Sequence, residues 1–279
     1  MAKTIVTMTS WKKRISSVGF DIAVFFKTQT CLPDAFYLVL AEEEFPNKLA
    51  SLPNDLLVIC AKYNVIIKWC KINDFCFKRW YVYPEHYNDL VITIDDDILF
   101  DTHLVELAKE HINERNRIYN VFKDLTYTYK FKPNDSKNFN LTDELSLRYR
   151  WLGCSVVCPQ SFPLDVFAER NLILRRHLCP YCDETWLKPF SIMNDTEIGY
   201  LPFDYHKSTV DQSMQNNATW QKLCTNYDGF QARDYQLFIN LISFPQHLLK
   251  WLTIYPTYNL EFYLSKGIHN CLRIAHTKY

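Results

Sequence analysis

Short apolar runs, rich in β-branched and aromatic residues, recur along the first part of the chain and alternate with segments of helical periodicity. A short apolar run bounded by polar residues predicts a strand, and apolar residues three or four positions apart predict a helix with one buried face. On this basis we predict strands over residues 4–9, 35–40, 65–69 and 91–94.

The segments between these strands predict helices. In the first of them Ile15, Val18, Ile22 and Phe25 fall on one face, and Ser10 can cap its start. Two more helices are predicted over residues 53–63 and 75–83. Repeated alternation of strand and helix implies an α/β fold, with a parallel sheet and helices on both faces. Ligands in such sheets bind beyond the carboxyl ends of the strands.

The second part of the chain has weaker periodicity. We expect residues 127–140, which are polar and aromatic, to form an irregular excursion over the site. Residues 246–279 are apolar and aromatic with scattered basic residues; they are expected to pack onto the domain or a partner, or to lie on a membrane surface. The remaining predicted elements are a strand over 151–158 and helices over 103–117, 164–174, 220–225, 232–241 and from about 183 onward.

Three consecutive carboxylates, Asp95, Asp96 and Asp97, close the fourth predicted strand. Adjacent anions repel one another and resist burial, and a hard divalent cation with oxygen ligands relieves both problems. The loop from Thr9 to Trp11 also follows a strand, so both loops should lie at the same edge of the sheet. We therefore predict a metal site that holds a phosphorylated ligand, with a charged turn at the strand end as the alternative.

Composition narrows the classes of function. The 279 residues are 48% hydrophobic and 16% aromatic, which supports a sizeable core. With 31 basic and 31 acidic side chains there is no overall positive field, so no nucleic-acid partner is expected. Neither GxGxxG nor GxxxxGK occurs, which leaves no dinucleotide fingerprint and no P-loop. With no signal peptide and no apolar run of transmembrane length, we expect a cytoplasmic protein, peripheral on the inner face of the membrane if residues 246–279 bind lipid.

Three separated motifs resemble, in their order, those of GT-A fold glycosyltransferases of the bacterial surface-polysaccharide kind. They are IVTMTSWKKRI at 5–15, ITIDDD at 92–97 and CDETWL at 182–187. The resemblance covers roughly residues 4–245. It implies transfer of a sugar from a nucleotide-diphosphate sugar, by default a UDP-sugar, to a glycan or lipid-linked acceptor in cell-surface polysaccharide synthesis.

The same resemblance implies a domain organisation. A GT-A-like catalytic domain with a Rossmann-like, mostly parallel sheet would span residues 1–245. Residues 1–120 would form the nucleotide-sugar-binding half and 121–245 a smaller acceptor-binding half. The aromatic and basic segment 246–279 would follow.

By this resemblance Mn²⁺ or Mg²⁺ binds the diphosphate. Asp97 would be a ligand of this ion, and Asp95 would face the ribose or be a further partner of the same ion. A helix cap, a core aromatic side chain or a solvated helix face would explain several of the other residues without a ligand. The nucleotide-sugar-binding residues expected on this basis are Thr9, Ser10, Trp11, Arg14, Asp74, Lys78, Asp95 and Asp96.

Asp183 is the candidate general base, because an inverting transfer needs a carboxylate beside the acceptor hydroxyl. Glu184 is the neighbouring alternative. Asp183 can also be the N-cap of a helix, where the helix terminus would stabilise the anion and lower its basicity. In a retaining enzyme Asp183 would bind the acceptor instead.

Several competing interpretations remain open. The Cys-Pro-Tyr-Cys run at 179–182 is also the motif of glutaredoxins, but here it lies deep in a longer chain. Together with Cys154 and Cys158 it could ligate zinc, although buried thiols are favoured. His206 could be a late metal ligand or a loop residue. The alternative functions are a nucleotidyltransferase and a non-catalytic glycan-binding or assembly subunit of the same fold.

Overall fold

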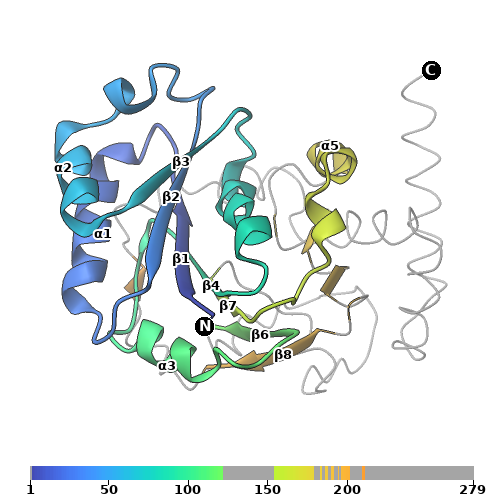
Figure 1. The fold of residues 1–279 in the computed structure, drawn as a ribbon. Helices are drawn as coiled ribbons and strands as arrows, with labels where there is room; N and C mark the ends of the chain where they lie inside the picture. The colour runs from blue at the N-terminus through green and yellow to red at the C-terminus, as the bar shows by residue number, and fades with distance from the viewer. Residues whose placement is uncertain are drawn as a thin grey trace, which may run out of the picture.

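The computed structural model describes residues 2–121 and 154–178 together with residues 183, 186, 187, 190, 191, 194, 196–201, 209 and 210. Within this part of the chain the protein is a mixed α/β structure in three layers, with a central sheet and helices on either side (Figure 1).

The central sheet has the strand order β3-β2-β1-β4-β7-β6-β8 over the described residues. All of these strands run parallel to one another except β7, which is antiparallel to its neighbours β4 and β6. A separate antiparallel pair is formed by β5 (Ile98–Leu99) and β9 (Thr209–Val210). The strands of the central sheet are β1 (Thr4–Thr9), β2 (Ala35–Ala41), β3 (Ile66–Cys70), β4 (Leu90–Ile94), β6 (Arg117–Asn120), β7 (Ser155–Val157) and β8 (Glu197–Tyr200).

The helices divide between the two faces of the sheet (Figure 1). One face is covered by α1 (Ile15–Thr28), α2 (Asn54–Tyr63) and α3 (Leu104–Glu110). The other is covered by the 3₁₀ helices η2 (Phe75–His86) and η3 (Leu164–Phe167) and by α5 (Glu169–Leu178). The short 3₁₀ helix η1 (Lys48–Ser51) lies between β2 and α2.

Strand β4 lies between the two cores and is fully buried along its length. Its alternate residues point to opposite faces: Ile92 joins the core under α1 and α2, and Val91 joins the core under η2. This arrangement explains why β4 is apolar at consecutive positions rather than at every second one. It also places the carboxylates that follow β4 near the centre of the sheet.

Helices α1 and α2 approach closely at Gly19. A Cβ atom there would lie 3.2 Å from the Cα of Leu56, closer than most Cβ contacts in proteins. The missing side chain therefore lets α2 pack directly on the backbone of α1.

The strands and helices predicted before residue 95 are confirmed, and apart from the segment 75–83 their bounds differ by a residue or two. The segment 75–83 is helical, but as a longer 3₁₀ helix that contains Pro84, which has no N–H to donate. The prediction that Ser10 caps α1 was wrong: the N-cap is Arg14, and the Ser10 hydroxyl donates to Asp96 instead.

The elements predicted after residue 95 differ more from the observed ones. Helix α3 ends at Glu110 rather than near residue 117, and strand β6 begins at Arg117. The strand predicted over 151–158 is the short, antiparallel β7, and the helix over 164–174 is divided into η3 and the longer α5. The predictions for residues 127–140, 220–225, 232–241 and 246–279 lie outside the described residues. Among the helices that are described, none is both long and apolar enough to cross a bilayer.

Candidate functional site

The loops that follow β1 and β4 meet at the carboxyl edge of the sheet, because these strands are parallel neighbours with Met8 opposite Ile94. From the first loop, the Arg14 guanidinium pairs through Nη1 with Asp96 and lies 3.1 Å through Nη2 from Asp97. The Ser10 hydroxyl donates to the other oxygen of Asp96. Asp96 is 5% exposed, so it is held inside the protein by these two side chains.

A second guanidinium, that of Arg79 on η2, contacts the remaining carboxylate of the triplet. Its Nη1 pairs with Asp95, while Nε and Nη2 lie 2.9 and 2.8 Å from Oδ2 of Asp183. The indole Nε1 of Trp80 donates to the same oxygen at 2.7 Å. The structure thus joins Asp183 to the carboxylate triplet through Arg79, a residue that the sequence analysis did not select.

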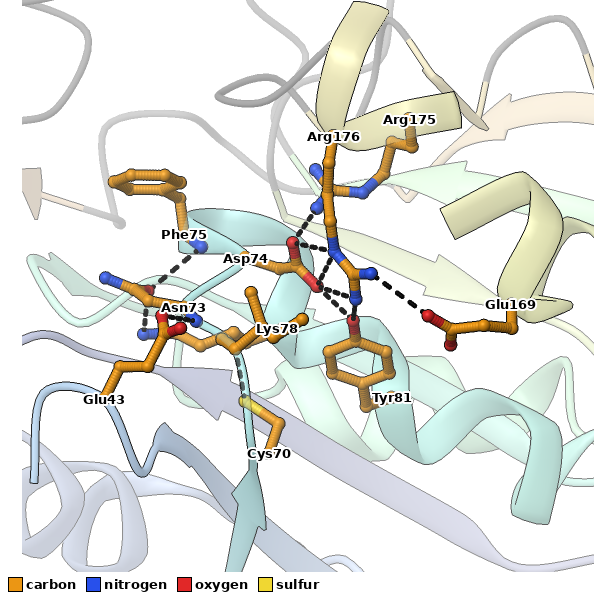
Figure 2. Close-up of polar contacts among 11 residues, drawn as sticks. Glu43, Cys70, Asn73, Asp74, Phe75, Lys78, Tyr81, Glu169, Arg175 and Arg176 are labelled. Atoms are coloured by element: carbon orange, nitrogen blue, oxygen red, sulfur yellow. Dashed lines mark hydrogen bonds and ion pairs between the residues drawn. The ribbon is translucent and has the colours of Figure 1, made fainter. Parts of the chain in front are cut away.

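Lys78 connects the loops that follow the first three strands. Its buried Nζ donates to the Ser10 carbonyl at 3.0 Å and to Glu44 at 2.9 Å. It also donates to Asn73 at 2.9 Å (Figure 2). Lys78 was expected to bind the nucleotide sugar; here its ammonium group donates to three protein acceptors.

Asp74, at the start of η2, faces α5 and is 2% exposed (Figure 2). Its carboxylate accepts from Arg176 at 2.9 and 3.0 Å, and also from Arg175 and the Tyr81 hydroxyl. The Arg175 guanidinium lies 4.4 Å above the ring of Phe77. Contact of Asp74 with a nucleotide sugar would require these bonds to open, and that role stays a prediction.

Two buried donors on the first loop have no acceptor among the residues that the structure describes. They are the indole Nε1 of Trp11 and the Nε of Arg14. A buried donor without an acceptor costs free energy, on the order of 1–3 kcal/mol. Oxygen atoms of a bound ligand would remove that cost. The adjacent Thr9 is tied to the sheet, since its hydroxyl donates to the Val39 carbonyl at 2.7 Å.

The carboxylates at this edge differ in acidity. Burial, and then the charge of Asp95, raise the pKa of Asp97 to about 7 in spite of Arg14. Burial also raises the pKa of Asp96, although Arg14 and Ser10 oppose the change. Burial would raise the pKa of Asp183 too, but the charge of Arg79 and the donors on Arg79 and Trp80 outweigh it and hold this pKa below its usual value.

Asp95 and Asp97 offer the oxygen ligands that Mg²⁺ and Mn²⁺ prefer, and such ions often take one or two carboxylates with phosphate and water completing the shell. A cation would also offset the cost of ionising Asp97 beside Asp95. Within the described residues no group of three His, Cys, Asp or Glu side chains converges on one point. The residues present therefore fit a cation shared with a phosphorylated ligand better than a closed protein cage.

Cys154 and Cys158 flank β7 and are buried in the core beneath α1, in agreement with the buried thiols that the sequence favoured. Burial raises the pKa of the Cys158 thiol to about 12. Their proposed zinc partners Cys179 and Cys182, together with Glu184 and His206, lie outside the described residues.

No family model and no curated protein matches this chain. A crystal structure of S. aureus TarS 1–349, a staphylococcal wall teichoic acid glycosyltransferase, aligns at 11% sequence identity with a TM-score of 0.47. The alignment covers 94% of this chain and 74% of that one. A likeness of this size establishes neither the fold nor the activity of this chain.

Proposed function

We propose that this protein is a metal-dependent glycosyltransferase that binds a nucleotide-diphosphate sugar at the carboxyl edge of its sheet. The observation that carries the proposal is the meeting of two kinds of group on adjacent parallel strands. The loop after β1 supplies buried donors, on Trp11 and Arg14, that have no acceptor among the described residues. The loop after β4 supplies carboxylates suited to a divalent cation.

The donor-binding wall would be the turn from Ser10 to Arg14. The nucleotide or its diphosphate would accept from Trp11 Nε1 and Arg14 Nε, both of which are buried donors. Arg14 also holds Asp96 and Asp97 in place. In this proposal Asp96 supports the wall from inside the protein, and Asp97 and Asp95 face the ligand.

The cation would be held by Asp97 and Asp95. When bound, it supplies positive charge to the diphosphate, which becomes more negative as its bond to the sugar breaks. In the transfer the acceptor hydroxyl oxygen bonds to the anomeric carbon, the bond to the diphosphate oxygen breaks, and a base removes the hydroxyl proton. Asp183 and Glu184 are the residues that the sequence offers for this base.

The acceptor and the nucleotide belong to the same proposal but rest on the resemblance in sequence alone. A glycan or lipid-linked acceptor in surface-polysaccharide synthesis and a UDP-sugar donor are the expected pair. A nucleotidyltransferase would use the same carboxylates and cation on a nucleoside triphosphate. A non-catalytic subunit would bind the ligand without turnover.

A thermal-shift screen of UDP-, GDP-, CMP- and dTDP-sugars, with and without Mn²⁺, tests the proposal. We expect one of these donors to raise the melting temperature only when Mn²⁺ is present, by the linkage between binding and folding. Hydrolysis of that donor should then be measurable, and Asp97→Ala should abolish both the shift and the hydrolysis.

Asp55→Ala removes an exposed carboxylate at the start of α2 and is the matched control, expected to leave both readouts unchanged. If no donor shifts the wild-type protein with Mn²⁺, or if Asp97→Ala behaves like the control, the proposal fails. A shift without hydrolysis or transfer would identify a binding subunit.

A further inference from the structure

The contacts of Arg79 divide its guanidinium into two sides. The side formed by Nε and Nη2 faces Asp183, at 2.9 and 2.8 Å from the same carboxylate oxygen. The opposite nitrogen, Nη1, pairs with Oδ1 of Asp95. The Arg79 side chain is itself only 3% exposed, so its position is set by these partners and by the core around it.

Asp95 is the most open member of the carboxylate triplet. Its side chain is 34% exposed, against 7% for Asp96 and 12% for Asp97. Arg79 occupies Oδ1, while Oδ2 lies 3.5 Å from the weakly donating thiol of Cys154. One oxygen of Asp95 is thus left without a charged partner among the described residues.

A guanidinium fork prefers to bind a carboxylate through two parallel N–H bonds, which would cover both oxygens. Asp183 prevents this at Asp95, because it already engages Nε and Nη2. If Asp183 lost its charge, Arg79 would have one remaining anion and would close on both oxygens of Asp95. The charge of Asp183 therefore controls how much of Asp95 is available to another cation.

We propose that Asp183 is a positioning residue that holds Arg79 away from one oxygen of Asp95 and so keeps that oxygen open for the metal ion. This inference rests on the proposed function, and it gives Asp183 a role different from the general base that its place in the sequence suggested.

The surroundings of Asp183 agree with this role. Its side chain is 3% exposed, and one of its oxygens receives three N–H groups, two from Arg79 and one from Trp80. A general base must reach the hydroxyl that it deprotonates. An acceptor hydroxyl would have to displace these donors to reach Oδ2, whereas a residue that orients a guanidinium needs this burial and these bonds.

The test compares wild type with Asp183→Asn and with the double variant Asp183→Asn/Arg79→Gln. Mn²⁺ binding is measured by electron paramagnetic resonance of the free ion, with UDP or whichever nucleoside diphosphate gives the largest thermal shift. Hydrolysis of the corresponding donor is measured in parallel against Mn²⁺ concentration. Glu85→Gln, which removes one charge from the exposed pair with Lys68, is the acid-to-amide control.

We expect Asp183→Asn to weaken Mn²⁺ binding about tenfold, as is typical when a group that orients a metal ligand is altered. The rate at saturating Mn²⁺ should be retained. The double variant should recover wild-type affinity, because it removes the guanidinium that closes on Asp95. This recovery is the decisive result, since a merely structural role for Asp183 would not produce it.

A different pattern would overturn the inference. If Asp183 is the base, both variants keep the wild-type affinity for Mn²⁺ and both lose turnover at saturating metal. If Asp183→Asn does not fold, the double variant still decides between the two roles, because neutral groups replace both members of the buried pair. Turnover of the double variant at saturating Mn²⁺ is retained if Asp183 is a positioning residue and lost if it is the base. If wild type binds no Mn²⁺ with any nucleotide, the proposed function itself fails. If wild type binds Mn²⁺ but the double variant does not recover the wild-type affinity, only the proposed role of Asp183 is refuted.

Discussion

Single residues at the carboxyl edge of the sheet are held mainly by partners far away in sequence. Arg79 and Asp183 are 104 positions apart, and Asp74 meets Arg175 across 101 positions. Local patterns cannot reveal such pairs, and the sequence analysis therefore did not anticipate that buried arginines hold Asp183 and Asp74. The run Lys78-Arg79-Trp80 was the available signal, because two cations inside an otherwise apolar and aromatic segment need buried anions.

The buried carboxylate of Asp74 should contribute strongly to the stability of the folded protein. Asp74→Asn should lower the free energy of unfolding by about 3–5 kcal/mol at neutral pH, because it leaves Arg175 buried beside a neutral amide. Urea denaturation measures the loss. Glu169→Gln, which removes the exposed partner of Arg176, is the control and should change stability by no more than about 0.5 kcal/mol.

The same residue predicts a dependence on pH. Burial raises the pKa of Asp74, but the Arg176 hydrogen bonds and the Arg175 charge outweigh it and leave the pKa below its ordinary value of 3.8. A lowered folded-state pKa gives stability that is complete above 3.8 and is lost as the pH falls through the folded value. The stability difference between wild type and Asp74→Asn should therefore shrink as the pH falls below 3.8. Because a titration extends about one pH unit on either side of the pKa, the difference should be constant above about pH 5. A constant difference down to pH 2 would contradict it.

Whole elements were predicted well where each carries its own pattern. Strands β1 to β4 are apolar runs bounded by polar residues, and helices α1 and α2 have clear apolar faces. Strands β6 and β8 were missed because each is four residues long and begins with a charged side chain, Arg117 or Glu197. The antiparallel direction of β7 depends on how the chain returns to β4, which no local pattern records.

The crossing of α1 and α2 gives a prediction for these elements. Gly19→Val places a branched side chain against the backbone at Leu56, where even a Cβ would lie 3.2 Å from Cα. We expect a loss of about 1–3 kcal/mol from overpacking. Ser16→Val adds the same side chain at an exposed position of α1, and its thermal melting should stay close to that of wild type. Equal melting temperatures for the two variants would show that the helices can separate freely at this point.

At the scale of the molecule, the two parts of the described chain share one sheet. β4 is covered on one side by β1 and on the other by β7, and η3, α5 and Trp186 complete the core under η2. Within the described residues, the sheet and the core under η2 therefore continue across residue 121, and the division into a nucleotide-sugar-binding half and an acceptor-binding half stays a prediction.

A fragment of residues 1–121 should accordingly fail to fold alone. Without β7, the apolar strand β4 becomes an exposed edge, which favours aggregation. Gel filtration and circular dichroism of the fragment measure the outcome, with the full chain as control. A monomeric fragment that unfolds cooperatively would contradict the prediction.

The contacts of Lys78 also affect the rigidity of the loops at the carboxyl edge of the sheet. A single ammonium group joins the loops after β1, β2 and β3 through Ser10, Glu44 and Asn73. Loops tied in this way should keep one arrangement in the free protein, and the proposed ligand would then cost little conformational entropy on binding. The edge of the sheet is then preorganised, and selectivity at the wall from Ser10 to Arg14 would come from the fit of the ligand to a fixed shape rather than from closure around it.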